Sequence, residues 1–260
     1  MNISQTKQLS SIYVLGVRVD RVTQQQVLDR VDSLIADYHA SQQQTACQQL
    51  VTVNPEFVMA AQRNPIFRQC INEAALVMPD GIGVVWAAHY LGKPTPERVT
   101  GVDTLVELAK RCAIKGYRLY LLGAAVGVAE AAGERLRTLA PGLQIAGSYA
   151  GSPVLAEEDE IIERIRVARA DVLCVAYGAP AQDVWIRRNL TRLPVAVAMG
   201  VGGSFDFLTG RQQRAPRIMQ KLGLEWLYRL YREPWRWHRM LALPKFAIQV
   251  MMKGNKFCGV

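Results

Sequence analysis

Short apolar segments alternate with longer amphipathic segments along the first 210 residues of this 260-residue chain, and this alternation limits the possible folds more than any other feature. Continuous apolar runs are typical of strands that are buried on both faces of a parallel sheet. Amphipathic segments between such strands are typical of helices that cover the sheet. The expected strands are residues 50–53, 76–78, 118–122, 144–148, 171–177 and 195–199. We therefore predict an α/β fold, with a Rossmann-like, mostly parallel sheet and helices on both faces.

The expected helices connect these strands. A strand or hairpin arm over residues 12–19 precedes them, and a helix starting at Pro55 is expected to reach towards Cys70, since proline suits the first helical turn. The other expected helices are residues 23–38, 82–91, 101–115, 126–139, 156–168, 181–189 and 217–232, with a further helix after Pro234.

Charge divides the chain into two parts. Residues 211–260 contain eleven lysines and arginines but only two acids, a net charge of +9 that equals the net charge of the whole chain. Residues 1–210 are therefore balanced. We expect a neutral α/β body over residues 1–210 and a basic helical appendage over residues 211–260, which suits a surface or a phosphate-rich partner.

Several classes of protein are disfavoured by the sequence. The five cysteines are far apart and the three histidines do not lie at metal-ligand spacing, so neither a disulfide framework nor a metal site is expected. The polar amino-terminal segment does not resemble a signal peptide, and no run of eighteen apolar residues occurs. These features predict a cytoplasmic protein without a membrane span.

Asp80 follows the apolar segment 76–78 and Pro79, and it precedes Gly81 and Gly83. Proline ends strand pairing, and glycines let a backbone approach a ligand closely. Asp80 is thus expected at the carboxyl end of a strand, where open α/β sheets bind ligands. An aspartate before a glycine is also common in turns and helix caps, so this pattern alone does not assign a function.

Other polar groups are expected at the same edge of the sheet. Thr52 and Asn54 follow one strand, Gln182 follows another, and the turn over residues 200–206 contains Gly202 and Gly203. Arg98 lies in a loop that can reach this edge. Together these residues offer hydroxyl, amide, carboxylate and guanidinium groups, without a metal cluster or a good nucleophile.

Three common nucleotide or catalytic motifs are absent. The best candidate for a dinucleotide fingerprint, residues 123–127, reads G-x-x-x-G rather than G-x-G-x-x-G. There is also no P-loop and no G-x-S-x-G nucleophile elbow. A nucleotide-dependent oxidoreductase is therefore disfavoured.

Aromatic and basic residues are interleaved in the appendage, where four arginines are expected to share one side of a helix that Pro234 interrupts. One interpretation is a solvated face whose aromatics lie in the core. Another is an amphipathic element at a membrane surface, where Trp and Tyr prefer the headgroups. A basic, aromatic tail can also bind RNA, although nucleic acid is not the expected partner. The residues concerned are Trp226, Tyr228, Arg229, Tyr231, Arg232, Trp235, Arg236, Trp237 and Arg239.

Six motifs in order make the chain resemble the WecG/TagA/CpsF glycosyltransferases from about residue 15 to residue 243. They are VTVNPE at 51–56, PDGIG at 79–83, RVTGVD at 98–103, GAPAQ at 178–182, GVGGSFD at 200–206 and RAP at 214–216. One departure is Asp183, where the family usually has glutamate.

This resemblance implies an inverting enzyme that moves a sugar from a UDP-sugar to a polyprenyl-diphosphate-linked sugar, without a cofactor or catalytic metal. It implies that Asp80 is the general base and that the appendage contacts the inner face of the cell membrane and completes the active site. The implied substrate-binding residues are Thr52, Asn54, Arg98, Gln182, Gly202, Gly203, Arg229, Arg236 and Arg239.

The chemistry is compatible with these roles, since one carboxylate suffices as base in a single displacement and arginines can stabilise a departing diphosphate. The donor can be N-acetylmannosamine-type or another hexose, and the product a cell-surface polysaccharide or teichoic-acid-type polymer. A non-catalytic peripheral membrane protein that senses UDP-sugars is the main alternative. Oligomeric state stays open, and a homo-oligomer is one option.

Overall fold

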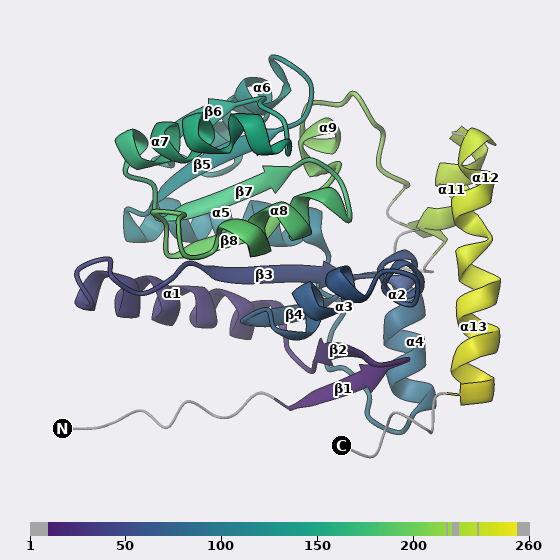
Figure 1. Ribbon diagram of the computed structural model, residues 1–260. Coiled ribbons are helices and arrows are strands. Elements are labelled where there is room, and N and C mark those ends of the chain that lie inside the picture. The colour runs from purple at the N-terminus through teal and green to yellow at the C-terminus, as the bar shows by residue number, and fades with distance from the viewer. Residues whose placement is uncertain (1–9, 217, 220–223, 233, 254–260) are drawn as a thin grey trace.

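The computed structural model describes residues 10–216, 218–219, 224–232 and 234–253 (Figure 1). In this part of the chain, a six-stranded sheet has the order β4-β3-β8-β7-β5-β6, and every neighbouring pair is parallel. The prediction of an α/β fold with a parallel sheet is confirmed. The strands are β3 (Gln48–Val53), β4 (Leu76–Pro79), β5 (Arg118–Gly123), β6 (Gln144–Tyr149), β7 (Val172–Ala176) and β8 (Val197–Gly200).

Helices cover both faces of this sheet. Those before residue 210 are α1 (Gln24–Ala40), α2 (Pro55–Ala61), α3 (Pro65–Asn72), α4 (Ile82–Tyr90), α5 (Gly101–Lys115), α6 (Val128–Leu139), the short 3₁₀ helix η1 (Leu155–Glu157), α7 (Glu158–Ala168), α8 (Ala181–Asn189) and α9 (Ser204–Leu208).

The predicted single helix from Pro55 towards Cys70 is wrong, because the segment forms two helices. Asn64 adopts an extended conformation, and its Oδ1 accepts a hydrogen bond from Phe67 N at 3.0 Å, so it caps a new helix. Pro65 then occupies the first position of α3, where its missing N–H costs nothing.

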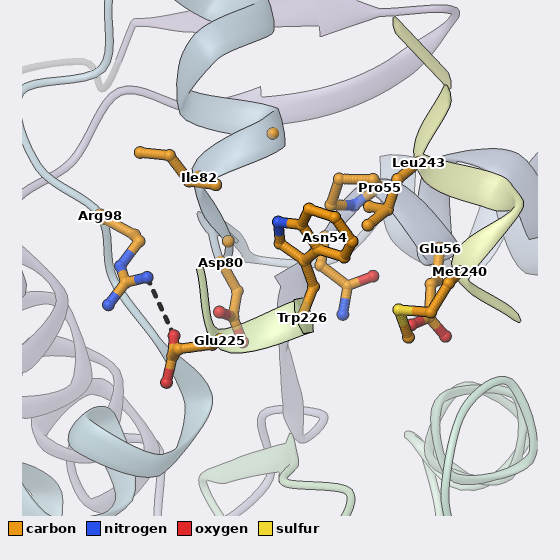
Figure 2. Close-up of a pocket in the computed structure, with 12 residues that line it drawn as sticks. Asn54, Pro55, Glu56, Asp80, Ile82, Arg98, Glu225, Trp226, Met240 and Leu243 are labelled. Atoms are coloured by element: carbon orange, nitrogen blue, oxygen red, sulfur yellow. Dashed lines mark hydrogen bonds and ion pairs between the residues drawn. The ribbon is translucent and has the colours of Figure 1, made fainter. Parts of the chain in front are cut away.

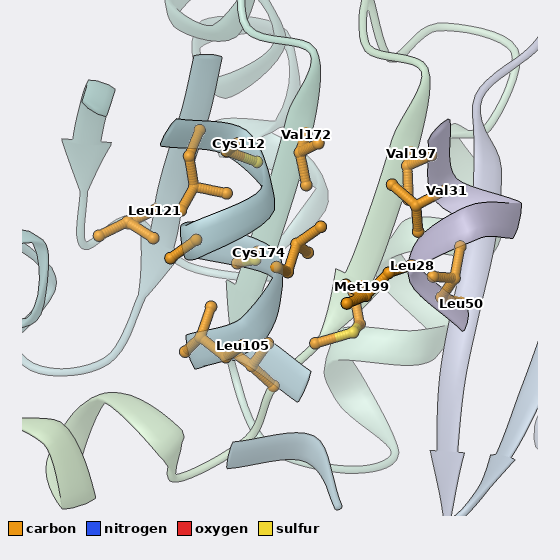
Figure 3. Packing of buried hydrophobic residues seen from close by; sticks show 14 of the residues in the cluster. Leu28, Val31, Leu50, Leu105, Cys112, Leu121, Val172, Cys174, Val197 and Met199 are labelled. Carbon is orange, nitrogen blue, oxygen red and sulfur yellow. The ribbon is translucent and has the colours of Figure 1, made fainter. Parts of the chain in front are cut away.

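Alternating side chains of the strands divide the core between the two faces of the sheet. Leu50 and Met199 pack with residues of α1, α5 and α6 on one face, as Figure 3 shows for Leu28 of α1 and Leu105 of α5. Val51 belongs to a second cluster, on the opposite face. That second cluster includes residues of α2, α3 and α4, while a third cluster joins α7 and α8 to β7 and β8.

A hairpin covers the outer edge of β4, the strand that leads to Asp80. It consists of β1 (Ser11–Val14) and β2 (Val17–Asp20), which pair antiparallel. Of the strand or hairpin arm expected over residues 12–19, the structure shows the hairpin. The buried Asp20 accepts a hydrogen bond from Val77 N at 2.8 Å, and Arg18 Nη1 donates to Asn72 O at 2.8 Å. The bond to Val77 satisfies a backbone group that the edge strand would otherwise expose, and the bond to Asn72 satisfies a carbonyl at the end of α3.

The basic segment folds as α11 (Glu225–Arg232), η2 (Pro234–Arg236), α12 (Trp237–Met240) and α13 (Ala242–Lys253). In Figure 1, α13 runs beside α4, and it packs against both α2 and α4. Phe246 and Val250 are buried there in the second core cluster. None of the helices in the described ranges combines the length and apolarity needed to cross a bilayer. The division into two domains at residue 210 stays a prediction.

Candidate active site

The carboxyl ends of the parallel strands lie at one edge of the sheet, as predicted. β3 ends at Val53 and β4 at Pro79, which are paired, so Asn54 and Asp80 directly follow the ends of two adjacent strands. β8 lies on the other side of β3 and ends at Gly200. This edge therefore gathers residues from sequence segments more than a hundred positions apart.

A cavity of about 130 Å³ opens at the ends of β3 and β4. Figure 2 shows the Asp80 carboxyl beside the ion pair of Arg98 with Glu225, while Trp226 of α11 also lines the cavity. Small-molecule sites usually enclose about 300–1,000 Å³, so this cavity can enclose one end of a nucleotide sugar but not the whole molecule. Its lining residues are Asn54, Pro55, Glu56, Asp80, Gly81, Ile82, Gly83, Arg98, Glu225, Trp226, Met240 and Leu243.

Backbone and helix geometry fix the position of Asp80. Its N–H donates to Val53 O at 2.8 Å, and its Oδ2 accepts from Gly101 N at 3.2 Å. Gly101 is the first residue of α5, so the carboxylate lies at the positive end of that helix, which favours negative charge. Gly81 then turns the chain with φ of +87°, a conformation that favours glycine.

Thr52 lies beside Asp80 on the same face of the sheet. A β-carbon added at Gly101 would be 3.4 Å from Thr52 Oγ1 and 3.8 Å from Asp80 Oδ2. A glycine at the start of α5 thus lets the helix approach both side chains closely. The structure brings together the predicted hydroxyl and carboxylate groups.

Asn54 lines the cavity, but its side-chain oxygen is hydrogen-bonded within its own chain segment. Oδ1 accepts a hydrogen bond from Phe57 N at 3.0 Å and caps α2. The packing around this cap is tight, because a β-carbon at Gly83 would lie 2.6 Å from Pro55 Cγ. Glycine at position 83 therefore lets the start of α4 pack closely against the start of α2, and a larger residue would force one of them to shift.

Gln182 does not line the cavity. Its side chain is buried, with 2% exposure, and Oε1 accepts hydrogen bonds from Gly178 N at 3.1 Å and Gly202 N at 3.0 Å. It thereby ties together the loops that follow β7 and β8. Gly202 and Gly203 also lie outside the cavity wall, and direct substrate contact by these three residues stays a prediction.

Asp183, the departure from the family motif, is buried with 1% exposure. Gln49 Nε2 donates to its backbone oxygen at 3.0 Å. Burial raises the pKa of the Asp183 carboxyl to about 7, an effect that the neighbouring Gln182 side chain reduces. The short acid therefore faces the protein interior beneath the edge rather than the cavity.

The predicted arginines of the appendage cannot be placed in the site. The side chains of Arg229, Arg236 and Arg239 lie outside the part of the chain whose side chains the structure describes. Within that part, no group of three or more His, Cys, Asp or Glu side chains could hold a metal ion.

Sequence reasoning missed the residues that complete the cavity, namely Glu56, Glu225, Trp226, Met240 and Leu243. One signal was present for Glu225, which is one of only two acids in the basic segment 211–260. An acid in such a segment is a candidate partner for a buried arginine elsewhere.

Comparison with known proteins supports the same assignment as the motifs. The family model "Glycosyl transferase WecG/TagA/CpsF family" matches residues 12–257. An N-acetylglucosaminyldiphosphoundecaprenol N-acetyl-beta-D-mannosaminyltransferase of Bacillus spizizenii is 36% identical over 86% of this chain and 88% of the relative. A protein of the same name from Staphylococcus aureus is 30% identical over 98% of both chains.

One solved structure shows only a weak similarity to this chain. A nicotinate phosphoribosyltransferase from Vibrio cholerae shares 15% identity over 78% of this chain and 50% of its own, with a TM-score of 0.25 that carries no argument. The match to the family model covers nearly the whole fold, including the strands and the loops that form the cavity. The chain belongs to the WecG/TagA/CpsF family and is a glycosyltransferase.

Proposed function

We propose that the protein transfers an N-acetylmannosamine-type sugar from a UDP-sugar to a polyprenyl-diphosphate-linked N-acetylglucosamine, with inversion. The observation that carries this proposal is the joint placement of Asp80 and Arg98 in one cavity, in a chain whose relatives are named for this transfer. The product would be a lipid-linked disaccharide for a cell-surface polysaccharide or a teichoic-acid-type polymer.

Asp80 is the proposed general base. It accepts the proton of the acceptor hydroxyl while that oxygen bonds to the anomeric carbon of the donor sugar. The bond from the anomeric carbon to the β-phosphate oxygen breaks, and UDP leaves with the bonding electron pair. A single carboxylate on the face opposite the leaving group is sufficient for this inverting displacement, and Gly101 N–H holds the Asp80 side chain in place.

Arginine side chains are the proposed stabilisers of the departing diphosphate. Arg98 lines the cavity with Asp80, and its guanidinium carries a permanent charge with five N–H donors. Charge-assisted hydrogen bonds to developing negative charge act mainly in the transition state. Arg229, Arg236 and Arg239 are proposed to contribute further donors.

The lipid-linked acceptor requires the cavity to open near a membrane surface, and we place the protein peripherally on the cytoplasmic face. The support is the exposure of Tyr231, Trp235 and Trp237 in the helices next to the cavity, together with Met251 and Met252 at the end of α13. Exposed aromatic residues in a basic segment suit the headgroup region of an anionic leaflet.

The experiment that tests this function is incubation with a panel of UDP-sugars and a short-chain lipid-diphosphate N-acetylglucosamine, followed by mass spectrometry of the lipid product. We expect transfer of an N-acetylhexosamine. The absence of a disaccharide product with every donor would contradict the proposal, and binding of a UDP-sugar without turnover would instead favour a sensor.

The role of Asp80 is tested separately with Asp80→Asn. Turnover should fall by about 10² to 10⁴, while UDP-sugar affinity changes little. Asp159→Asn is a matched control, since it removes a carboxylate whose side chain is 90% exposed and does not line the cavity. Turnover of Asp80→Asn close to that of the control would remove Asp80 from the base role.

A further inference from the structure

A ring of ion pairs links residues 98–103 to Arg214 and Glu225, and two of its members, Arg98 and Glu225, line the cavity. Arg98 Nη1 lies 3.0 Å from Glu225 Oε2, and Arg214 Nε lies 3.6 Å from Glu225 Oε1. Arg214 then contacts Asp103 with both terminal nitrogens, at 2.6 and 2.9 Å. Thr100 Oγ1 donates to Asp103 Oδ2 at 2.6 Å, so the ring closes on the segment that begins with Arg98.

Glu225 holds the central position in this ring. Each of its carboxylate oxygens faces a different arginine, and its side chain is only 22% exposed, close to the 21% of Arg98. Pairs of this kind are less screened than surface pairs. The Arg214 guanidinium holds the pKa of the Asp103 carboxyl below its usual range, so the pair of Asp103 with Arg214 stays charged at neutral pH.

The segment held by the ring is also bonded to the end of β4. Val99 N donates to Pro79 O at 2.9 Å, and Gly101 N donates to Asp80 Oδ2 at 3.2 Å. Residues 98–103 therefore connect Glu225 to the proposed base through one short stretch of backbone. Any displacement of this segment moves Arg98 and the hydrogen bond to Asp80 together.

We propose that Glu225 is a positioning residue for the active site, which deepens the proposed sugar transfer and rests on it. By pairing with Arg98 and Arg214, Glu225 fixes the 98–103 segment against β4 and orients Arg98 towards the diphosphate of the substrates. The contact through Nη1 uses only part of the five-donor guanidinium, so pairing with Glu225 is compatible with anion binding. Glu225 also brings Trp226, the next residue of α11, over the cavity.

A first test needs no substrate. Hydrogen exchange should be about tenfold faster at the amides of residues 99–103 in Glu225→Gln than in the wild-type protein. Glu107→Gln is the matched control, because Glu107 also lies on α5 and pairs with Lys110 on the surface. Equal exchange in Glu225→Gln and the control would overturn the proposal.

A second test shows whether Glu225 acts through Arg98. UDP affinity is measured by calorimetry for Glu225→Gln, Arg98→Gln and the double variant. Glu225→Gln should weaken UDP binding about five- to tenfold in the wild-type background and less than twofold in the Arg98→Gln background, since neighbours in one network are not additive. Additive effects, or tighter UDP binding by Glu225→Gln, would overturn the positioning role.

Two further measurements distinguish loss of the positioning role of Glu225 from a variant that does not fold and from a protein that does not transfer sugar. Glu225→Asp keeps the charge but is one methylene shorter, which weakens its pairing with the two arginines, so its exchange rates and UDP affinity should be intermediate. A melting temperature within a few degrees of wild type shows that each variant is folded. If the wild-type protein binds no UDP and transfers no sugar, the proposed function fails, and the exchange experiment still decides whether Glu225 fixes the segment.

Discussion

Replacing Asp183 with asparagine should remove a pH dependence of stability that this buried carboxyl imposes. A β-carbon at Gly200 would lie 2.8 Å from Asp183 Oδ1 and 2.6 Å from Gln182 Nε2, so the carboxyl is packed directly against backbone. Burial raises its pKa from 3.8 to about 7, because ionisation inside the protein loses hydration. Asparagine has nearly the same shape and cannot ionise.

The sign of the effect follows from the raised pKa. The folded protein binds the proton of Asp183 more tightly than the unfolded chain, so this stabilisation is complete below pH 3.8 and is lost as the pH rises to about 7. At 1.36 kcal/mol for each pKa unit, the loss amounts to at most about 4 kcal/mol. Asp183→Asn should therefore be more stable than wild type at pH 8, with a smaller difference at pH 5.

Urea unfolding at pH 5, 6, 7 and 8 measures this difference, with Asp159→Asn as the control for loss of an exposed carboxylate. The free energy of unfolding of Asp183→Asn, minus that of wild type, should increase steadily with pH. The difference for the control should be small and nearly constant. A difference for Asp183→Asn that is the same at every pH would refute the reasoning.

Three other changes probe the edge of the sheet and the appendage. Gln182→Leu leaves the N–H groups of Gly178 and Gly202 without their acceptor, so the free energy of unfolding measured by thermal unfolding should fall by about 2–4 kcal/mol. An unchanged melting temperature would mean that water replaces the amide. Gly83→Ala forces a contact with Pro55 and should cost about 1–3 kcal/mol. Gly133→Ala should be nearly neutral, because its β-carbon would lie 3.4 Å from Leu121 Cδ1 and 3.7 Å or more from Ile145, which are ordinary contacts with side-chain atoms. Truncation before Leu224 should reduce both co-sedimentation with anionic vesicles and sugar transfer, and undiminished co-sedimentation would contradict the membrane role of the appendage.

Local pattern was sufficient for most of the sheet. Apolar runs such as residues 171–177 identified strands, because a parallel strand covered on both faces has no polar side. The boundary missed at Asn64 and Pro65 shows the limit of this reasoning, since a cap and a proline can either start a helix or interrupt one. The order of the strands in the sheet was not predicted, because it depends on pairings such as β3 with β8, which lie far apart in sequence.

Only part of the predicted site is found in the wall of the cavity. Asn54, Asp80 and Arg98 line one cavity, as expected for residues at or near strand carboxyl ends. Gln182 was also expected at this edge, but its burial depends on neighbouring loops that close over it. A side chain's exposure is a property of its surroundings, which residue type and position in a motif do not specify.

The amino-acid sequence therefore established the fold class and the placement of Asn54 and Asp80 at one edge of the sheet, since these follow from local periodicity and from chain order. The role of Asp80 as the candidate base came from the resemblance of its motif to the family. Tertiary structure alone decided that Glu225 stands between Arg98 and Arg214, 127 residues after Arg98. The physical reason is that ion pairs require side chains to meet within a few ångströms. That meeting depends on how α13 packs on α2 and α4 and so brings the basic segment back to the cavity.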